Sequence, residues 1–435
     1  MQISNLLNSY YAPQKKLGFQ AGYNINVGAG QNKEKGGFNT GCNGKSLGIQ
    51  EMPYHNQFPQ TLAASIAPEI KGDSQAKVWL AAPGGLNRDE KGAFITIPNI
   101  IGERDKLPVG RVYLSQIQKA IKEVNPDAEV KVTNDGLMQA VTDIRNNKVR
   151  EFLDQNLSEG ECAFVRFGAG GCGGYEVRKT DKGYQLIPKQ IGHLVMPEKE
   201  INPKYLIPKN NDTPESIESY STCAPAALRN FALELGFSPE NAKKISDTVE
   251  GRIITKDIVK LDRNDEEQLK QSEALKKLTN EGLFVHEQKG DIDEYILISP
   301  KTGEPITHEE RVTGLKAAST EYFKGIGVML ADGASHMATT IALTAGFDSH
   351  LAKAAREDAG LNPEQIIRET AFRNIDNERK TAIGNPDGFK ILIQDTGEPS
   401  DPKNAELIIG KGKVVGDYQY GYIPFRALPK TKSKV

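Results

Sequence analysis

A strand that runs into a glycine-rich loop and continues as a second strand occurs twice in this chain. The first copy lies within residues 22–48, and the second lies within residues 161–178, where ECAFVRF leads into GAGGCGG and then YEVR. Glycine permits backbone positions that other residues cannot adopt, so each loop can bring bare N–H groups against a phosphate. The repetition predicts two related half-domains. Taken alone, either glycine run is equally compatible with a tight hairpin that binds nothing.

Helical and strand patterns alternate around these hairpins. Apolar residues at helical spacing predict helices, and short apolar or alternating runs predict strands. We expect helices over residues 60–70, 114–123, 137–150, 225–235, 310–331 and 350–359, and strands over residues 76–82, 128–133 and 339–343. This order is typical of an α/β protein. A highly charged stretch near residues 260–280 is expected to be a mainly helical, solvated surface insertion.

The length of the chain predicts its division into lobes. At 435 residues it is too long for one ordinary core, so we expect two lobes with a cleft between them. The expected parts are a flexible leader (1–18), a smaller first lobe (19–135), a larger second lobe (136–430) and a short basic tail (431–435). A composition that is 38% hydrophobic and 26% charged is ordinary for a soluble globular protein.

Charge and hydropathy exclude several classes of protein. There are 55 Lys and Arg against 57 Asp and Glu, so no global basic field exists to hold nucleic acid or an anionic membrane. No apolar run approaches the ~20 residues of a membrane helix, and the first residues lack the apolar centre of a secretory signal. We therefore expect a cytoplasmic protein. Its four cysteines are scattered without metal-ligand spacing, which favours reduced thiols.

Asn134 and Asp135 stand where a predicted strand ends and a predicted helix begins. In an open α/β sheet this carboxyl edge faces the ligand crevice, so a carboxylate here can point at a substrate. The alternative is that Asp135 only caps the following helix. His193, which follows a turn, and Glu218, in the first turn of a predicted helix, each have a structural explanation of the same kind.

Five short motifs, taken in order, resemble one family. They are AAPGGLNRDEKGAFITIPNIIG (81–102), VTNDG, VRFGAGGCGG, QIGH and IESYSTCAPAALRNFA (217–232). Together they look like the bacterial ROK family (repressors, open reading frames and kinases), which includes glucokinases and other hexose kinases. The resemblance covers about residues 17–346 and is strongest over residues 81–232.

The resemblance implies a two-lobed, ribonuclease H-like fold of the actin/hexokinase type, with the active site in the interlobe cleft. It also implies ATP-dependent phosphorylation of a hexose, with Mg²⁺, and Asp135 matches the catalytic base. The matched sugar-binding positions are Asn99, Asn134, Asp135, Gln190, His193 and Glu218. The matched nucleotide positions are Asn26, Gly28 and Gly30 in the first phosphate loop, Gly168, Ala169 and Gly170 in the second, and Gly346 near the adenosine.

These residue types suit the implied reaction. Phosphoryl transfer needs alignment and charge stabilisation, so loop amides and a metal ion hold the phosphates while one carboxylate accepts the hydroxyl proton. Carboxylate, amide and imidazole groups can satisfy several sugar hydroxyls.

The chain departs from the family pattern at four positions. Asn26 stands where the family usually has an Asp that helps organise magnesium, and Gln190 replaces an acid that grips the sugar. Gly30 and Ala169 replace threonines that help bind phosphate. The family's Cys-rich zinc motif is absent, so we expect no structural zinc and no metal held by the protein alone.

These departures support a rival function, a catalytically degraded relative that acts as a sugar-binding or scaffold module. Retention of Asp135 and of the glycine loop favours the kinase, because a binding module has no need of a base. A repressor is disfavoured, since no basic helix-turn-helix precedes the first lobe. An acetate-kinase-like or other actin-fold phosphotransferase stays open. The expected partners are a hexose and ATP, with no nucleic acid or membrane, and the family resemblance suggests a homodimer.

Overall fold

The computed structural model of the chain describes residues 23–29, 37–42, 45–51, 55–82, 86–96, 111–134, 147–167, 173–181, 183–190, 194–206, 215–248, 258–264, 266–333, 338–344, 346–394 and 423–424. The chain divides into two compact units. The first contains residues 1–165, 174–188 and 396–435, and the second contains residues 166–173 and 189–395. The lobe boundary expected at residue 135 stays a prediction. The leader and tail, residues 1–18 and 431–435, lie outside the described residues.

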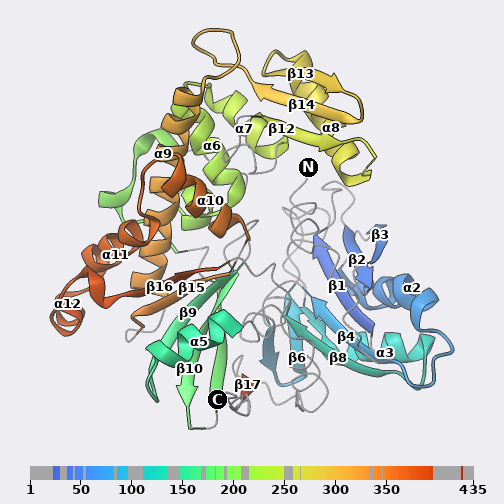
Figure 1. Ribbon diagram of the computed structural model, residues 1–435. Coiled ribbons are helices and arrows are strands. Elements are labelled where there is room, and N and C mark those ends of the chain that lie inside the picture. The colour runs from blue at the N-terminus through green and yellow to red at the C-terminus, as the bar shows by residue number, and fades with distance from the viewer. Residues whose placement is uncertain are drawn as a thin grey trace, which may run out of the picture. The chain divides into compact units, whose positions relative to one another are not determined.

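A five-stranded sheet forms the centre of the first unit (Figure 1). Its strands are β1 (Tyr23–Ala29), β2 (Gly37–Cys42), β3 (Lys45–Glu51), β4 (Lys77–Ala82) and β8 (Glu129–Asn134). They lie in the order β3-β2-β1-β4-β8; β2 is antiparallel to β1 and β3, and β4 is parallel to β1 and β8. Ile25, Val78 and Leu80 are fully buried, as the two-residue repeat of a strand with one face on the core requires.

Helices pack on this sheet and carry its core. The remaining elements of the unit up to residue 124 are η1 (His55–Gln57), α2 (Phe58–Ile70), β5 (Leu86–Asp89), β6 (Gly92–Thr96), β7 (Arg111–Tyr113) and α3 (Leu114–Val124). Leu62 and Ile66 of α2, four residues apart, are fully buried on one face of the helix. The Asn125 side chain donates a 2.7 Å hydrogen bond to the Ile70 carbonyl, so it joins the ends of α2 and α3.

A six-stranded sheet has the order β16-β15-β9-β10-β11-β17. Its strands are β9 (Cys162–Phe167), β10 (Gly173–Thr180), β11 (Gly183–Gln190), β15 (Thr340–Leu343), β16 (Lys390–Ile393) and β17 (Ile423–Pro424), and α5 (Asn147–Asn156) precedes β9. β15 and β16 are parallel, and β17 is antiparallel to β11. Ala163, Phe164 and Val165 are successive and all fully buried, which is typical of a strand covered on both faces.

The two sheets share one strand order. If the strands of each sheet are numbered by their order along the chain, the five strands of the first sheet lie side by side in the order 3-2-1-4-5. The strands β11-β10-β9-β15-β16 of the second sheet lie in the same order. This is the strand order of the ribonuclease H-like fold. The predicted α/β, ribonuclease H-like fold and its internal repetition are therefore confirmed; the cleft between lobes stays a prediction.

Helices dominate the second unit. Besides α8, described below, the described helices are η2 (Glu198–Glu200), η3 (Pro203–Tyr205), η4 (Glu218–Thr222), α6 (Ala224–Leu235), α7 (Pro239–Thr248), α9 (His308–Val328), η6 (Met329–Gly333), α10 (Gly346–Glu357), α11 (Pro363–Asn374), α12 (Asn377–Ile383) and η7 (Pro386–Gly388). α9 packs against α6 and α11 (Figure 1). Two glycines of α9 permit this: a Cβ at Gly314 would lie 2.9 Å from the Phe231 ring, and one at Gly327 would lie 2.7 Å from Thr370.

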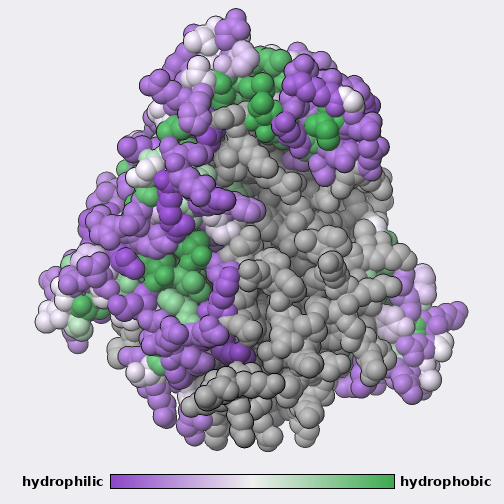
Figure 2. All heavy atoms as spheres, viewed as in Figure 1, coloured by the Kyte–Doolittle hydropathy of each residue, from purple (hydrophilic) through white to green (hydrophobic). Residues whose placement is uncertain are grey.

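The charged stretch near residues 260–280 belongs to a small α/β element. β12 (Val259–Asp262), β13 (Phe284–Lys289) and β14 (Ile292–Leu297) form a sheet in the order β12-β14-β13, and α8 (Glu266–Asn280) packs on β12 and β13. Its described surface is largely hydrophilic in Figure 2, at the upper right. The predicted helix is confirmed. However, the element has a core of its own, because Leu275 and Tyr295 are fully buried.

Asp293 of β14 lies in a buried polar cluster of this element. Its carboxylate accepts hydrogen bonds from Ser272 Oγ (2.5 Å) and His286 Nε2 (2.8 Å), and Lys276 Nζ lies 3.8 Å away. Arg263 Nε is also 3.8 Å away. Burial alone would raise the pKa of Asp293, but the two hydrogen bonds and the nearby cations hold this pKa below its ordinary value.

Asp293→Asn is expected to weaken the element at neutral pH and to reduce its sensitivity to acid. Because the pKa of Asp293 is lower in the folded state, its stabilisation is complete above the unfolded pKa of about 3.9 and is lost as the pH falls through the folded pKa. Hydrogen exchange of peptides from residues 266–297, compared with wild type between about pH 6 and pH 3, measures this. Asp291→Asn, at an exposed neighbour, is the control; equal acid sensitivity of both variants would contradict the assignment.

The other predicted elements agree with the structure except at their ends. The helix expected over residues 310–331 is α9 followed by the π-helical turn η6, and the helix expected over 350–359 begins earlier, at Gly346. The helix expected over 137–150 overlaps α5 only at its end, because residues 135–146 lie outside the described part. No helix among the described residues has the length and apolar character needed to span a membrane.

Candidate functional site

The first sheet holds three of the predicted site residues. Asn134 is the last residue of β8 and pairs in register with Ala82, the last residue of β4. Asn26 of β1 pairs with Ala81, one residue earlier on β4. The parallel strands β1, β4 and β8 therefore bring Asn26 and Asn134 to nearly the same level of the sheet, about 10 Å apart at one strand spacing per step. Gly28 lies two residues further along β1, opposite Asn39 of β2.

Several predicted residues lie outside the part of the chain that the structure describes. They are Gly30, Asn99, Asp135, Gly168, Ala169, Gly170 and His193. Asp135 follows directly on the end of β8, and residues 168–172 connect β9 to β10. Their roles stay predictions.

Backbone pairing brings together the segments that carry His193 and Glu218. Ile217 N–H donates to the Leu194 carbonyl at 2.7 Å, and Met196 N–H donates to the Glu215 carbonyl at 2.8 Å. His193 directly precedes Leu194, and Glu218 directly follows Ile217, so this hydrogen bond lies next to both predicted residues in the chain. Gln190 is the last residue of β11, which leads into the same segment.

Glu218 begins the π-helix η4 (Glu218–Thr222). The Thr222 hydroxyl donates to the Ile217 carbonyl at 3.0 Å, and the Cys223 thiol donates to the Glu218 carbonyl at 3.2 Å. Residues 219–222 are buried, whereas Glu218 is partly exposed. π-Helical turns are rare and occur frequently at functional sites.

Gly325 of α9 allows η4 to pack this closely. A Cβ at this position would lie 2.2 Å from Thr222 Cγ2 and 2.8 Å from Ser221 Oγ. Gly325→Ala is therefore expected to destabilise the protein by about 1–3 kcal/mol through overpacking, which outweighs the ~1 kcal/mol that Ala gains over Gly in a helix. Thermal unfolding measures the change. Thr313→Ala, at an exposed position of α9, is the control, and a Gly325→Ala protein more stable than wild type would contradict the packing.

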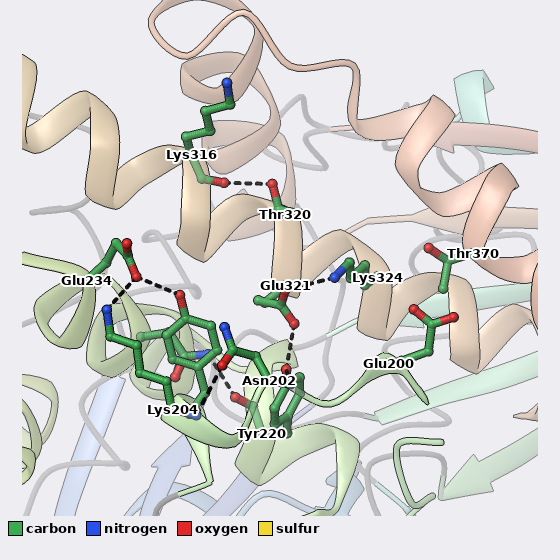
Figure 3. Close-up of polar contacts among 12 residues, drawn as sticks. Glu200, Asn202, Lys204, Tyr220, Glu234, Lys316, Thr320, Glu321, Lys324 and Thr370 are labelled. Carbon is green, nitrogen blue, oxygen red and sulfur yellow. Dashed lines mark hydrogen bonds and ion pairs between the residues drawn. The ribbon is translucent and has the colours of Figure 1, made fainter. Parts of the chain in front are cut away.

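Tyr220 of η4 is held by Glu321 of α9. The Tyr220 hydroxyl donates to Glu321 Oε2 at 2.6 Å and accepts from the Asn202 N–H at 2.8 Å, while Lys324 Nζ donates to Glu321 Oε1 at 2.9 Å. Figure 3 shows Glu321 between Tyr220 and Lys324. Burial, and then the adjacent Glu321 charge, raises the pKa of Tyr220 above its ordinary value, so the phenol stays protonated.

Ion pairs and hydrogen bonds fix residues 194–206 to the helices. Glu200 accepts from Arg373 Nε at 2.7 Å. Glu234 accepts from Lys204 Nζ at 2.8 Å, as Figure 3 shows. Burial would raise the pKa of Glu200, but the Arg373 guanidinium lowers it below its ordinary value. The segment after His193 is thus built into the second unit.

Arg166 of β9 and Asp348 of α10 form an ion pair whose side chains are both fully buried. The Arg166 carbonyl accepts from Thr344 N and from Thr344 Oγ1, each at 3.0 Å. The Tyr322 hydroxyl donates to the same Asp348 carboxylate. Our sequence reasoning missed this cluster. The available signal was an arginine inside the apolar strand ECAFVRF, immediately before the glycine run.

The described residues contain no group of three or more His, Cys, Asp or Glu placed to hold a metal ion. The expected absence of structural zinc stays a prediction.

Comparison with known proteins gives fold-level likeness alone. No family model matches the chain, and no curated protein matches its sequence. Solved structures that resemble the chain include three glucokinases. One from Balamuthia mandrillaris, in complex with glucose, is 12% identical, with 92% of this chain and 96% of that chain covered and a TM-score of 0.42.

Two further glucokinases are similar to a comparable extent. One from an Antarctic psychrotroph is 11% identical, with 90% of this chain and 99% of that chain covered and a TM-score of 0.38. One from Leishmania braziliensis is 10% identical, with 91% and 94% covered and a TM-score of 0.42. Scores in this range do not establish a shared activity, and membership of the ROK family stays a prediction. The fold assignment follows from the strand order of the two sheets.

Proposed function

We propose that this protein is an ATP-dependent kinase that phosphorylates a hexose, with Asp135 as the general base. The observation that supports it is the matching position of the two glycine-rich segments. One follows β1 and the other follows β9, and these are the central strands of two sheets with the same strand order. A glycine-rich segment can approach a phosphate through its backbone N–H groups.

The proposed roles of the side chains follow from their hydrogen-bonding capacity. Asp135 accepts the proton of the attacking sugar hydroxyl, a task that suits a carboxylate just beyond the carboxyl end of a parallel strand. The other sugar contacts provide amide, imidazole and carboxylate groups for the remaining hydroxyls. They are Asn99, Asn134, Gln190, His193 and Glu218.

The proposed nucleotide site is formed mainly by backbone. Residues 168–170 would hold phosphates, and the amides at the start of α10, with Gly346 as its first residue, favour a negatively charged or polar group. Asn26 and Gly28, in the second half of β1, and Gly30, directly after it, would supply the other phosphate contacts. ATP would supply the phosphoryl group, and Mg²⁺ bound with it would neutralise its charge. With Gly30 and Ala169 in place of hydroxyl residues, we expect weak nucleotide binding, because two donors are lost.

The rival function is a sugar-binding or scaffold module of the same fold. The missing phosphate-binding hydroxyls at Gly30 and Ala169 favour it, and the presence of Asp135 favours the kinase. A dimer in the cytoplasm remains part of the proposal for either function.

ADP release from MgATP, measured with and without a panel of hexoses and amino sugars, tests the proposed kinase. Thermal shifts with each ligand alone identify the rival, because a ligand at about 100 times its dissociation constant adds about 2.7 kcal/mol to stability. Sugar-dependent ADP release supports the kinase. Stabilisation by sugar without any turnover supports the sugar-binding module. No response to any ligand would contradict both the kinase and the sugar-binding module, and would leave the scaffold.

A further inference from the structure

Arg166 joins the ends of three segments that the proposed function assigns to substrates. It lies two residues before Gly168, its partner Asp348 lies two residues after Gly346, and its Nη2 donates to the carbonyl of Thr222, the last residue of η4. The same π-helix begins at Glu218. The Arg166 guanidinium therefore contacts the segments proposed for adenosine and sugar, from the strand that leads into the segment proposed for phosphate.

We infer that Arg166, Asp348 and Tyr322 are positioning residues that couple nucleotide binding to sugar binding. The inference rests on the proposed function for the identity of the ligands. In this role, none of the three residues contacts a substrate. They set the relative positions of the backbone segments that do.

Every part of this cluster is fixed by more than one contact. The Arg166 carbonyl is held by both donors of Thr344, and the guanidinium Cζ lies 5.3 Å from the centre of the Tyr322 ring. The Asp348 carboxylate accepts hydrogen bonds from both the Arg166 guanidinium and the Tyr322 hydroxyl. A displacement of η4 or of the first turn of α10 must therefore disturb the same ion pair.

The energetics favour a positioning role over simple stabilisation. A fully buried ion pair loses about as much in desolvation as it gains by attraction, and well-packed apolar side chains often serve stability equally well. A planar guanidinium with fixed donors, by contrast, specifies the direction of each partner. Other ion pairs of the second unit, such as Arg311–Asp358 and Arg373–Glu200, join helices without contacting the three proposed segments.

Tyr322→Phe tests the inference because it removes one hydrogen bond to Asp348 and keeps the ring beside Arg166. We expect the KM for MgATP to rise about fivefold or more, with kcat changed less than about twofold. The factor by which saturating sugar tightens binding of a non-hydrolysable ATP analogue should fall by a similar amount. Tyr205→Phe is the matched control, since its hydroxyl bonds Glu234 elsewhere in the same unit, and it should change neither quantity.

The outcomes separate this inference from the proposed function. If the wild type turns over, and Tyr322→Phe has an unchanged KM for MgATP and unchanged sugar–nucleotide coupling, the inference fails and the proposed kinase stands. Wild-type binding of both ligands without turnover would overturn the kinase alone, and the coupling measured by binding would still decide the inference. Failure of wild type to bind the ATP analogue would overturn both. If Tyr322→Phe does not fold, Thr344→Val, which removes the hydroxyl donor to the Arg166 carbonyl, gives the same measurement.

Discussion

Replacement of Asp135 by Asn is expected to lower the kcat for sugar-dependent ADP release about 10²- to 10⁴-fold. Asn has nearly the same shape and can still hydrogen-bond a sugar hydroxyl, but it cannot accept a proton. The KM for the sugar should therefore change much less than kcat. Steady-state ADP release at saturating MgATP, with the hexose that gives the fastest wild-type turnover, provides both constants.

Asp127→Asn is the matched control for this variant. Asp127 is exposed and precedes the same strand, β8, at its opposite end. Its replacement should leave kcat within about twofold of wild type, since exposed substitutions away from a site change little. If Asp135→Asn kept most of the wild-type kcat, Asp135 would be a helix cap and the base would have to be another residue.

Replacement of Asp348 by Asn is expected to destabilise the second unit by about 3–5 kcal/mol. The change leaves the fully buried Arg166 guanidinium without its counter-ion, and removal of one partner of a buried pair costs about this much. Urea unfolding followed by far-ultraviolet circular dichroism measures it. Asp247→Asn removes one member of the exposed Lys243–Asp247 pair and should cost no more than about 1 kcal/mol.

The double variant Arg166→Met with Asp348→Leu separates stability from positioning. Apolar replacement of both partners is expected to restore most of the stability lost in Asp348→Asn, because no unpaired charge remains. By the inference above, it should not restore tight binding of the nucleotide. A double variant with both stability and wild-type nucleotide affinity would show that the pair has no positioning role.

The local parts of the fold were predictable from the sequence. Periodicity located α2, α3, α6 and α9, and the apolar runs located β4, β8, β9 and β15, because these elements bury a regular face or a whole strand. The strands β13 and β14 were missed. Their sequences, FVHEQK and IDEYIL, carry charges at many positions, and Asp293 is buried only because Ser272 and His286 satisfy it.

The candidate site was predictable only where it is local in sequence. The glycine runs and the Asn134-Asp135 pair are short motifs whose chemistry is visible in the residues themselves. The Arg166–Asp348 pair spans 182 residues, and no periodicity or motif connects residues so far apart. The contacts between residues 194–196 and 215–217 were likewise invisible, because a backbone bridge carries no signature in side-chain type.

The antiparallel pairing of β12 with β14 places Val259 directly opposite Tyr295. The polypeptide therefore enters and leaves the α8 element at points about 5 Å apart, one strand spacing. A segment whose ends are neighbours and which has a core of its own can be replaced as one unit. Evolution or an engineer can exchange it, shorten it or graft it elsewhere while the surrounding helices keep their connection.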